Sequence, residues 1–174
     1  MIGNLIKLRA VELADIDLLY KWENDVSSWY LSNTITPFSK FLLEEYIANA
    51  QLDIYTTKQL RLMIEIIKTN KTIGCIDLFD FEPRHLRAGI GILICEEERN
   101  KGFASEALSL LIHYCFKVLL LNQLFCNITS DNFNSLELFK KFNFEIIGLK
   151  KQWIRKENEW IDEYMLQLIY NKIV

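Results

Sequence analysis

The clearest periodic pattern in the chain begins just after residue 102. Apolar residues recur there at spacings of three and four positions, which predicts a helix with one continuous apolar face. The residues of that face are Ala104, Ala107, Leu108, Leu111, Ile112, Cys115, Phe116 and Leu119. The apolar run at 90–95 is long enough for a buried strand, and the polar segment 96–102 follows it. The pattern therefore predicts a strand, a polar turn and a helix in succession.

Shorter patterns predict the other elements. Helices are expected after Asp15 and after Ser39, each residue serving as an N-cap, and at about 134–142. Further strands are expected at 5–8, 62–67, 73–79, 124–128, 145–154 and 160–169. This order of strands and helices predicts an α/β (α+β) fold with a mixed, mostly antiparallel central sheet flanked by helices, rather than an alternating doubly wound one.

Length and composition fit one domain. The chain has 174 residues, 51% of them hydrophobic, with no Pro/Gly/Ser linker and no internal repeat, so residues 1–174 are expected to form a single domain. The net charge of −3 comes from interleaved signs, which argues against a nucleic-acid surface. The four cysteines stand among apolar neighbours and the two histidines have no ligand-like spacing, so no metal site is expected. Without a signal-like start or an apolar run of membrane-spanning length, a cytoplasmic protein with no membrane partner is expected.

The first chemical signal is the turn Arg99-Asn100-Lys101-Gly102-Phe103-Ala104 between the predicted strand and helix. The free N–H groups at a helix start form an anion site, and a glycine lets a phosphate approach the backbone. A solvated loop with one turn glycine would have the same sequence. The string lacks the G-x-x-x-x-G-K-[ST] pattern of a Walker loop.

Further motifs follow this turn in order. Asn132 and Ser135 match an Asn-x-x-Ser/Ala pattern about thirty residues later, and Phe139 opens the segment Phe139-Lys140-Lys141-Phe142-Asn143-Phe144 at a predicted helix end. Together with Arg99, Gly102 and Ala104, which match R/Q-x-x-G-x-G/A, residues 71–169 resemble the GNAT (GCN5-related N-acetyltransferase) superfamily. The closest similarity is to the branch of spermidine and ribosomal-protein N-terminal acetyltransferases, which Leu8-Arg9-Ala10 and Trp22-Glu23-Asn24-Asp25 also resemble.

The resemblance implies a site for acetyl-CoA as cosubstrate. Main-chain groups of Ile92, Leu93 and Ile94 would pair with the pantetheine arm as an added strand would. The pyrophosphate would lie on the turn and helix start formed by Arg99, Asn100, Lys101, Gly102, Phe103, Ala104 and Ser105. Asn132 would hydrogen-bond the pantetheine with Ser135 beside it, although a turn residue and an early helix residue would also fit these positions.

Three departures from the family pattern bear on function. Asn143 replaces the usual glycine at a helix end, and asparagine also forms left-handed caps. Phe139 replaces a tyrosine that protonates the departing thiolate, so Ser135, four residues earlier on the same helix face, is the expected donor. Gly89 stands where many members carry a glutamate that helps to deprotonate the amine.

The expected reaction is direct attack of a primary amine on the thioester, the amine being polyamine-like or a protein N-terminus. Candidate bases are Asp77, Asp80, Glu82 and His85, and a backbone N–H near Leu93 or Ile94 would bind the oxyanion. The wall of the acceptor site is expected to contain Trp22, Glu23, Asp25, Trp29 and Glu82, although helix packing of the two tryptophans and solvated surface acids would also fit these positions. A homodimer is left open. The alternatives are a catalytically silent acyl-CoA-binding sensor or partner protein and a phosphate-binding module.

Overall fold

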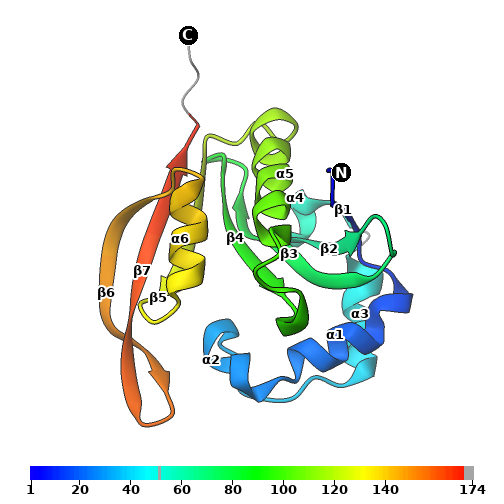
Figure 1. Ribbon diagram of the computed structural model, residues 1–174, viewed down its shortest axis with the longest axis horizontal. Helices are drawn as coiled ribbons and strands as arrows, with labels where there is room; N and C mark the ends of the chain where they lie inside the picture. The colour runs from blue at the N-terminus through cyan, green and yellow to red at the C-terminus, as the bar shows by residue number, and fades with distance from the viewer. Residues whose placement is uncertain (51, 171–174) are drawn as a thin grey trace.

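The computed structural model describes residues 1–50 and 52–170, so the last four residues of the expected domain lie outside the described part. The described residues form a seven-stranded sheet in the order β1-β2-β3-β4-β5-β7-β6 (Figure 1). The strands are β1 (Ile6–Ala10), β2 (Leu60–Ile66), β3 (Thr72–Glu82), β4 (Arg87–Ile94), β5 (Gln123–Thr129), β6 (Glu145–Lys156) and β7 (Glu159–Ile169). Among these strands only β4 and β5 pair in parallel, which confirms the predicted mixed, mostly antiparallel sheet.

The helices are α1 (Ile16–Glu23), α2 (Trp29–Ser32), α3 (Lys40–Asn49), α4 (Ile54–Thr57), α5 (Phe103–Lys117) and α6 (Phe133–Lys141). Short 3-10 turns, η1 (Leu13–Asp15), η2 (Val26–Ser28) and η3 (Glu96–Glu98), precede α1, α2 and α5. The sequence did not predict α2, α4 or the 3-10 turns, because a single helical turn is too short to show a periodic pattern.

Two apolar cores lie on opposite faces of the sheet. On one face, Ile76 and Leu78 of β3 join Leu108 and Leu111 of α5 in the larger core. On the other face, Cys75 belongs to a smaller core with residues of α1 and α3. Because successive strand residues point to opposite faces, β3 serves both cores. In Figure 1, α5 and α6 cover the front of the sheet and α1 and α3 lie at its other side.

The two predicted N-caps have different outcomes. The Ser39 hydroxyl accepts from the Leu42 N–H at 3.1 Å, so its capping role is confirmed. Asp15 does not cap α1 with its side chain. Its carboxylate instead accepts from the Glu12 N–H at 2.9 Å and from the Arg9 guanidinium at 2.7 Å. The prediction for Asp15 was wrong because a half-buried arginine from β1, Arg9, competes for the same carboxylate.

The parallel pair β4–β5 is short. It runs from Arg87/Gln123 to Gly89/Phe125, after which the strands diverge, although β4 continues to Ile94 and β5 to Thr129. β4 starts before the predicted position because the two glycines at 89 and 91 interrupt its apolar pattern. Beyond Gly89 and Phe125 the two strands are unpaired and their ribbons separate in the middle of the sheet (Figure 1); the region between these unpaired parts is called the β4–β5 opening below.

Candidate acetyl-CoA and acceptor site

The edge of β4 offers main-chain groups to the opening. The Cys95 N–H donates to the Ile73 carbonyl at 2.8 Å and therefore faces β3. Because strand residues alternate in the side to which their N–H and C=O groups point, Leu93 also faces β3, where it pairs with Cys75. Ile92 and Ile94 face the opening. The structure therefore favours Ile92 and Ile94, and not Leu93, for main-chain contacts with a ligand in the opening.

The turn before α5 has the shape of an anion cradle. Asn100 and Gly102 both have positive φ, 60° and 85°, so the backbone curls back on itself before α5 begins at Phe103. A Cβ on Gly102 would meet no heavy atom within 4 Å of it, so the space in front of the glycine is open. The N–H groups of the first turn of α5 have no intrahelical acceptor and are available to an anion, since the first four of any helix are unpaired.

The charged side chains of this turn are already engaged. The Arg99 Nε donates to the Ile94 carbonyl at 3.1 Å and so ties the turn to the end of β4. Lys101 and Lys71 both pair with Glu98, at 2.8 and 2.6 Å. These two lysine hydrogen bonds hold the pKa of Glu98 below its usual value. An anion on this turn would therefore be bound chiefly through backbone N–H groups, with the lysines adding positive charge at its edge.

The start of α6 forms the opposite side of the opening. Asn132 is the N-cap, and its Oδ1 accepts from the Ser135 N–H at 3.2 Å. Ser135 is half-buried in the first turn. Phe139, one turn later, is only 2% exposed and packs edge to face against Phe144, with ring centroids 5.0 Å apart. Asn143 has the left-handed φ of 61° expected of a helix end.

The other face of the sheet carries an ion cluster that the sequence did not predict. Arg61 of β2 donates from Nε and Nη2 to the two oxygens of Asp77, at 2.9 and 2.7 Å, and from Nη1 to Oε1 of Glu23. The guanidinium also lies over the Tyr46 ring, 5.5 Å from its centroid. Burial raises the pKa of Tyr46 to about 12, so its phenol stays neutral. No single-sequence pattern links Arg61 to Asp77, because sheet register decides that they are neighbours.

Next to this cluster, an aromatic ring covers a glycine. Phe79 lies on the same face of β3 as Asp77, and its ring sits over Gly89 of β4, where a Cβ would come within 2.3 Å of Cε2. The ring also contacts Phe125 of β5 edge to face, with centroids 5.7 Å apart. A glutamate at position 89 would therefore displace Phe79, which accounts for the departure from the family pattern in steric terms.

The remaining expected acceptor and base residues do not contribute side chains to the Arg61 ion cluster. The Asp25 carboxylate accepts from the Ser27 N–H at 3.0 Å, and Glu82 accepts from the Arg84 N–H at 3.0 Å. Asp80 is exposed with a φ of 48° in the irregular end of β3, and His85 is exposed in the turn that follows. Trp22 packs on the smaller core, and the Trp29 indole donates to the Glu23 carbonyl at 2.9 Å. Of the acids that the sequence indicated for the acceptor site, Glu23 and Asp77 are the two that the described structure brings together, because both bind Arg61.

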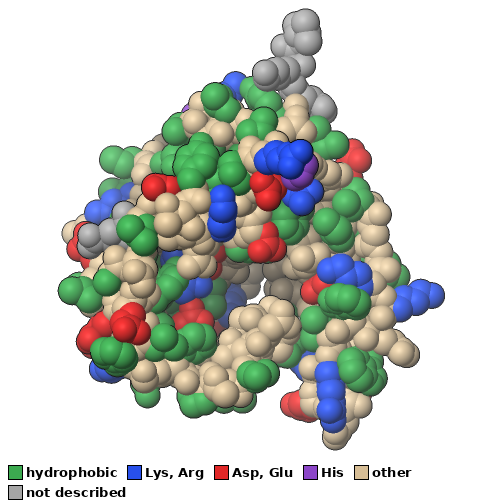
Figure 2. Space-filling view, turned by 180° about the vertical axis from the view of Figure 1, so that it is seen from behind, with side chains coloured by type: hydrophobic (Ala, Val, Ile, Leu, Met, Phe, Trp, Pro, Cys, Tyr) green, Lys and Arg blue, Asp and Glu red, His purple; other side chains and the backbone are tan. Residues whose placement is uncertain are grey.

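On the β5–β7–β6 side of the opening, the charged side chains are paired with one another. On this same face, Lys150 of β6 pairs with Glu163 of β7 at 2.6 Å and with the Asn127 amide oxygen of β5 at 3.0 Å. Lys156 pairs with Asp131 at 2.8 Å and lies over the Tyr30 ring, 4.7 Å from its centroid. The second contact connects α2 to the β6–β7 hairpin. Figure 2 shows this face from behind, hollowed at its centre between the α1–α3 side and the hairpin.

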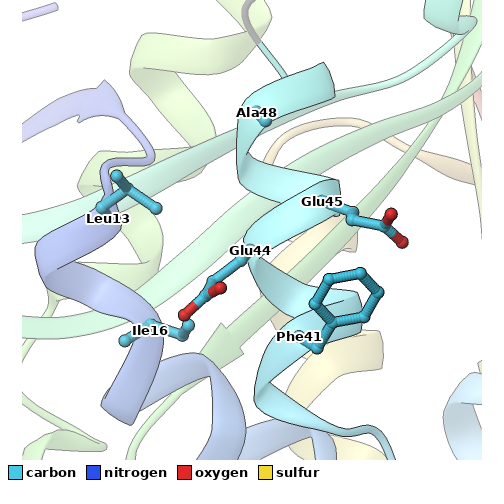
Figure 3. A pocket seen from close by; sticks show the side chains of 6 residues that line it. All are labelled: Leu13, Ile16, Phe41, Glu44, Glu45 and Ala48. Atoms are coloured by element: carbon cyan, nitrogen blue, oxygen red, sulfur yellow. The ribbon is translucent and has the colours of Figure 1, made fainter.

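A separate surface groove lies between η1, α1 and α3, away from the β4–β5 opening (Figure 3). It is lined by Leu13, Ile16, Phe41, Glu44, Glu45 and Ala48. In residues 1–50 and 52–170, no three His, Cys, Asp or Glu side chains are grouped so that they could hold a metal ion. No helix in that part of the chain is both long and apolar enough to cross a membrane.

Comparisons with known proteins agree with this geometry. Residues 6–145 match the model of the acetyltransferase (GNAT) domain family. The chain is 30% identical over 165 residues to the uncharacterized N-acetyltransferase p20 of Bacillus licheniformis, covering 94% of this chain and 92% of that protein. It is 25% identical over 146 residues to the spermidine N(1)-acetyltransferase of Escherichia coli K12, covering 82% and 74%.

A solved structure extends the similarity to the fold. The spermidine N-acetyltransferase of Vibrio cholerae, in complex with CoA and spermine, superposes with a TM-score of 0.86 at 20% identity, covering 96% of each chain. The family match spans most of the sheet and both sides of the opening, including the Gly102 turn and Asn132. The chain therefore belongs to the GNAT acetyltransferase family and is an acetyl-CoA-dependent N-acetyltransferase.

Proposed function

We propose that this enzyme transfers the acetyl group of acetyl-CoA to a primary amine by direct attack in the β4–β5 opening. The observation that carries the proposal is the divergence of β4 and β5 after Gly89, beside an open cradle at Gly102. The coenzyme phosphates would lie on the Gly102 turn, and the pantetheine would run along Ile92 and Ile94 towards Asn132. The amine would enter from the opposite face, where Glu23, Arg61 and Asp77 lie.

In the proposed reaction, the neutral amine nitrogen attacks the thioester carbon and the C–S bond breaks. The main-chain N–H of Ile94, which faces the opening, is our candidate donor to the tetrahedral oxyanion. The coenzyme leaves as a thiolate and takes up one proton, and the attacking nitrogen loses one. The Ser135 hydroxyl is our candidate donor to the thiolate, because Phe139 has no hydrogen-bonding group.

The proton on the incoming ammonium needs an acceptor. Asp77 is the weaker candidate, because both of its oxygens bind the Arg61 guanidinium. Glu23 binds Arg61 through Oε1 and keeps Oε2 for other partners. We therefore assign proton removal to Glu23, directly or through water, and assign Asp77 to holding Arg61 in place. Asp80 and His85 are exposed and Glu82 accepts from the Arg84 N–H, so these three residues are not assigned a role.

Relatives named for spermidine make a polyamine one class of acceptor to test, and a protein N-terminus is another. The competing function is a silent acyl-CoA sensor, which Phe139 and Gly89 favour. Release of free thiol from acetyl-CoA separates the two functions, since only an enzyme releases it in proportion to added amine.

The role assigned to Glu23 has its own test. We expect Glu23→Gln to lower kcat at least tenfold, about 1.4 kcal/mol of barrier, with coenzyme affinity unchanged. Asp25→Asn, two residues along the chain, is the matched control and should keep full turnover.

A further inference from the structure

The charge on the acceptor face limits the number of ammonium groups that it can match. Glu23 and Asp77 carry two negative charges, and Arg61 between them carries one positive charge. Across the opening, the pairs Lys150–Glu163 and Lys156–Asp131 are each neutral. Together these seven groups carry one net negative charge. One ammonium group would match it, whereas the further ammonium groups of a polyamine would have no opposite charge among them.

Beside that charge, the acceptor face is apolar. The rings of Phe79 and Phe125 are half-buried and meet edge to face where β4 and β5 diverge. Gly91, the neighbour of Asp77 across the sheet, has no side chain to cover them, and the nearest atom to its Cβ position is Phe79 Cε1 at 3.9 Å. The two half-buried rings are therefore not covered by a side chain from position 91, which leaves apolar surface beside the ion cluster.

The charged and apolar parts stand a fixed distance apart. Asp77 and Phe79 lie two residues apart on the same face of β3, so their Cα atoms are separated by roughly 7 Å. A molecule that places its ammonium near Glu23 and Asp77 would thus place a substituent two or three carbons away on the rings. A carbon substituent gains free energy there by leaving water, whereas a second ammonium loses its hydration.

Taking the proposed acetyl transfer as given, we propose that the acceptor is a monoamine with an aromatic or branched apolar substituent, and that Phe79 selects it. An amine of this class is 2-phenylethylamine, and the N-terminus of a peptide that begins with an apolar residue presents the same groups. Phe79 acts by direct contact with the substituent, and its position over Gly89 and against Phe125 fixes the ring. This substrate class differs from the spermidine for which several relatives are named.

The test compares kcat/KM for 2-phenylethylamine and spermidine, measured by thiol release from acetyl-CoA. We expect the wild-type enzyme to favour 2-phenylethylamine at least tenfold. Phe79→Ala should lower kcat/KM for 2-phenylethylamine about tenfold and change the spermidine value less than about twofold, since one lost apolar contact is worth roughly that factor. Phe79→Leu, which keeps an apolar side chain, should retain most of the preference.

Phe41→Ala is the matched control, because it makes the same change at a phenylalanine that is 68% exposed on α3, outside the acceptor face. Phe41→Ala should leave kcat/KM unchanged for both 2-phenylethylamine and spermidine. A wild-type enzyme that prefers spermidine overturns the inference even if Phe79→Ala does not fold, and so does a Phe79→Ala enzyme that loses both activities equally. Thiol release with none of the amines would instead contradict the proposed acetyl transfer, and the inference would fall with it.

Discussion

The Phe79 ring and the Gly89 backbone lie in direct contact across β3 and β4, at the last residue pair before β4 and β5 diverge. The absence of a side chain at Gly89 is what allows the ring to occupy this space and reach Phe125. One glycine and one aromatic residue thus replace a charged group by an apolar surface at the base of the opening. In the proposed acceptor site, this contact is what would present the Phe79 ring to the substituent of the amine.

This contact predicts coupled effects on stability. Gly89→Ala would push the Phe79 ring away and weaken its contact with Phe125, so we expect the free energy of unfolding to fall by about 1 kcal/mol. In a Phe79→Ala background the same glycine change should cost nothing, because neighbouring residues couple. Urea unfolding of the four proteins measures this coupling. Gly91→Ala is the control, and an equal loss there would show that the ring is not the cause.

A second prediction concerns acid stability at the start of the chain. Arg9 binds Asp15 at 2.7 Å and Glu65 at 2.6 Å, and Asp15 is almost fully buried. Burial alone would raise the pKa of Asp15, but the hydrogen bonds from Arg9 and from the Glu12 backbone lower it overall. The hydrogen bonds from Lys7 and Arg9 also lower the pKa of Glu65.

Carboxylates with a lowered pKa stabilise the fold above their unfolded values, 3.8 for Asp15 and 4.5 for Glu65, and this stabilisation is lost as the pH falls through the folded values. Arg9→Ala should cost about 3 kcal/mol at neutral pH and flatten the decline in stability below pH 4.5. Chemical unfolding across pH 2–7 measures both effects. Lys40→Ala breaks an exposed pair with Asp17 and should change neither. If Arg9→Ala lost stability with falling pH as the wild type does, the acid sensitivity would not come from the pairs of Arg9 with Asp15 and Glu65.

The Gly102 turn can be tested with two substitutions. On sequence grounds, Gly102→Val should block the phosphates while the fold stays intact. The φ of 85° changes that expectation for valine, which should lower stability by roughly 1–2 kcal/mol without ligand. Asparagine tolerates left-handed conformations and should be nearly neutral. Acetyl-CoA at a hundredfold excess over its Kd should stabilise the wild type by about 2.7 kcal/mol and stabilise neither variant to that extent. If acetyl-CoA stabilised Gly102→Asn as much as the wild type, the proposed binding of the phosphates at this turn would be contradicted.

Ser135 provides a test of thiolate protonation. We expect Ser135→Ala to lower kcat at least tenfold with little change in coenzyme affinity, because general-acid assistance is typically worth ~10²–10⁴ in rate. The Asn132 cap depends on the Ser135 N–H, which alanine retains, so α6 should be unaffected. Steady-state kinetics with the best acceptor and a far-UV circular dichroism spectrum measure the two effects. Full turnover in Ser135→Ala would leave the serine as a helix-start residue only.

The sequence predicted the parts of this molecule that depend on local pattern. The α5 helix, the turn before it and the order of strands follow from spacing and from residues with special backbone preferences, such as Gly102 and Asn143. The Arg61–Asp77 pair and the Phe79–Gly89 contact could not be predicted. Both join residues at least ten positions apart, and the sheet register that brings them together leaves no trace in one sequence. Asp77 and Asp80 looked equivalent as bases for the same reason.

The measurement that tests the central claim most directly is thiol release from acetyl-CoA by the purified protein, with and without a panel of primary amines. The panel should include 2-phenylethylamine, a peptide with an apolar N-terminal residue, and spermidine. We predict amine-dependent release that saturates with at least one of these acceptors and yields one acetylated amine for each thiol, as mass spectrometry of the product would show. Binding of acetyl-CoA with no amine-dependent release from any acceptor would contradict the account and leave a coenzyme-binding protein without transferase activity.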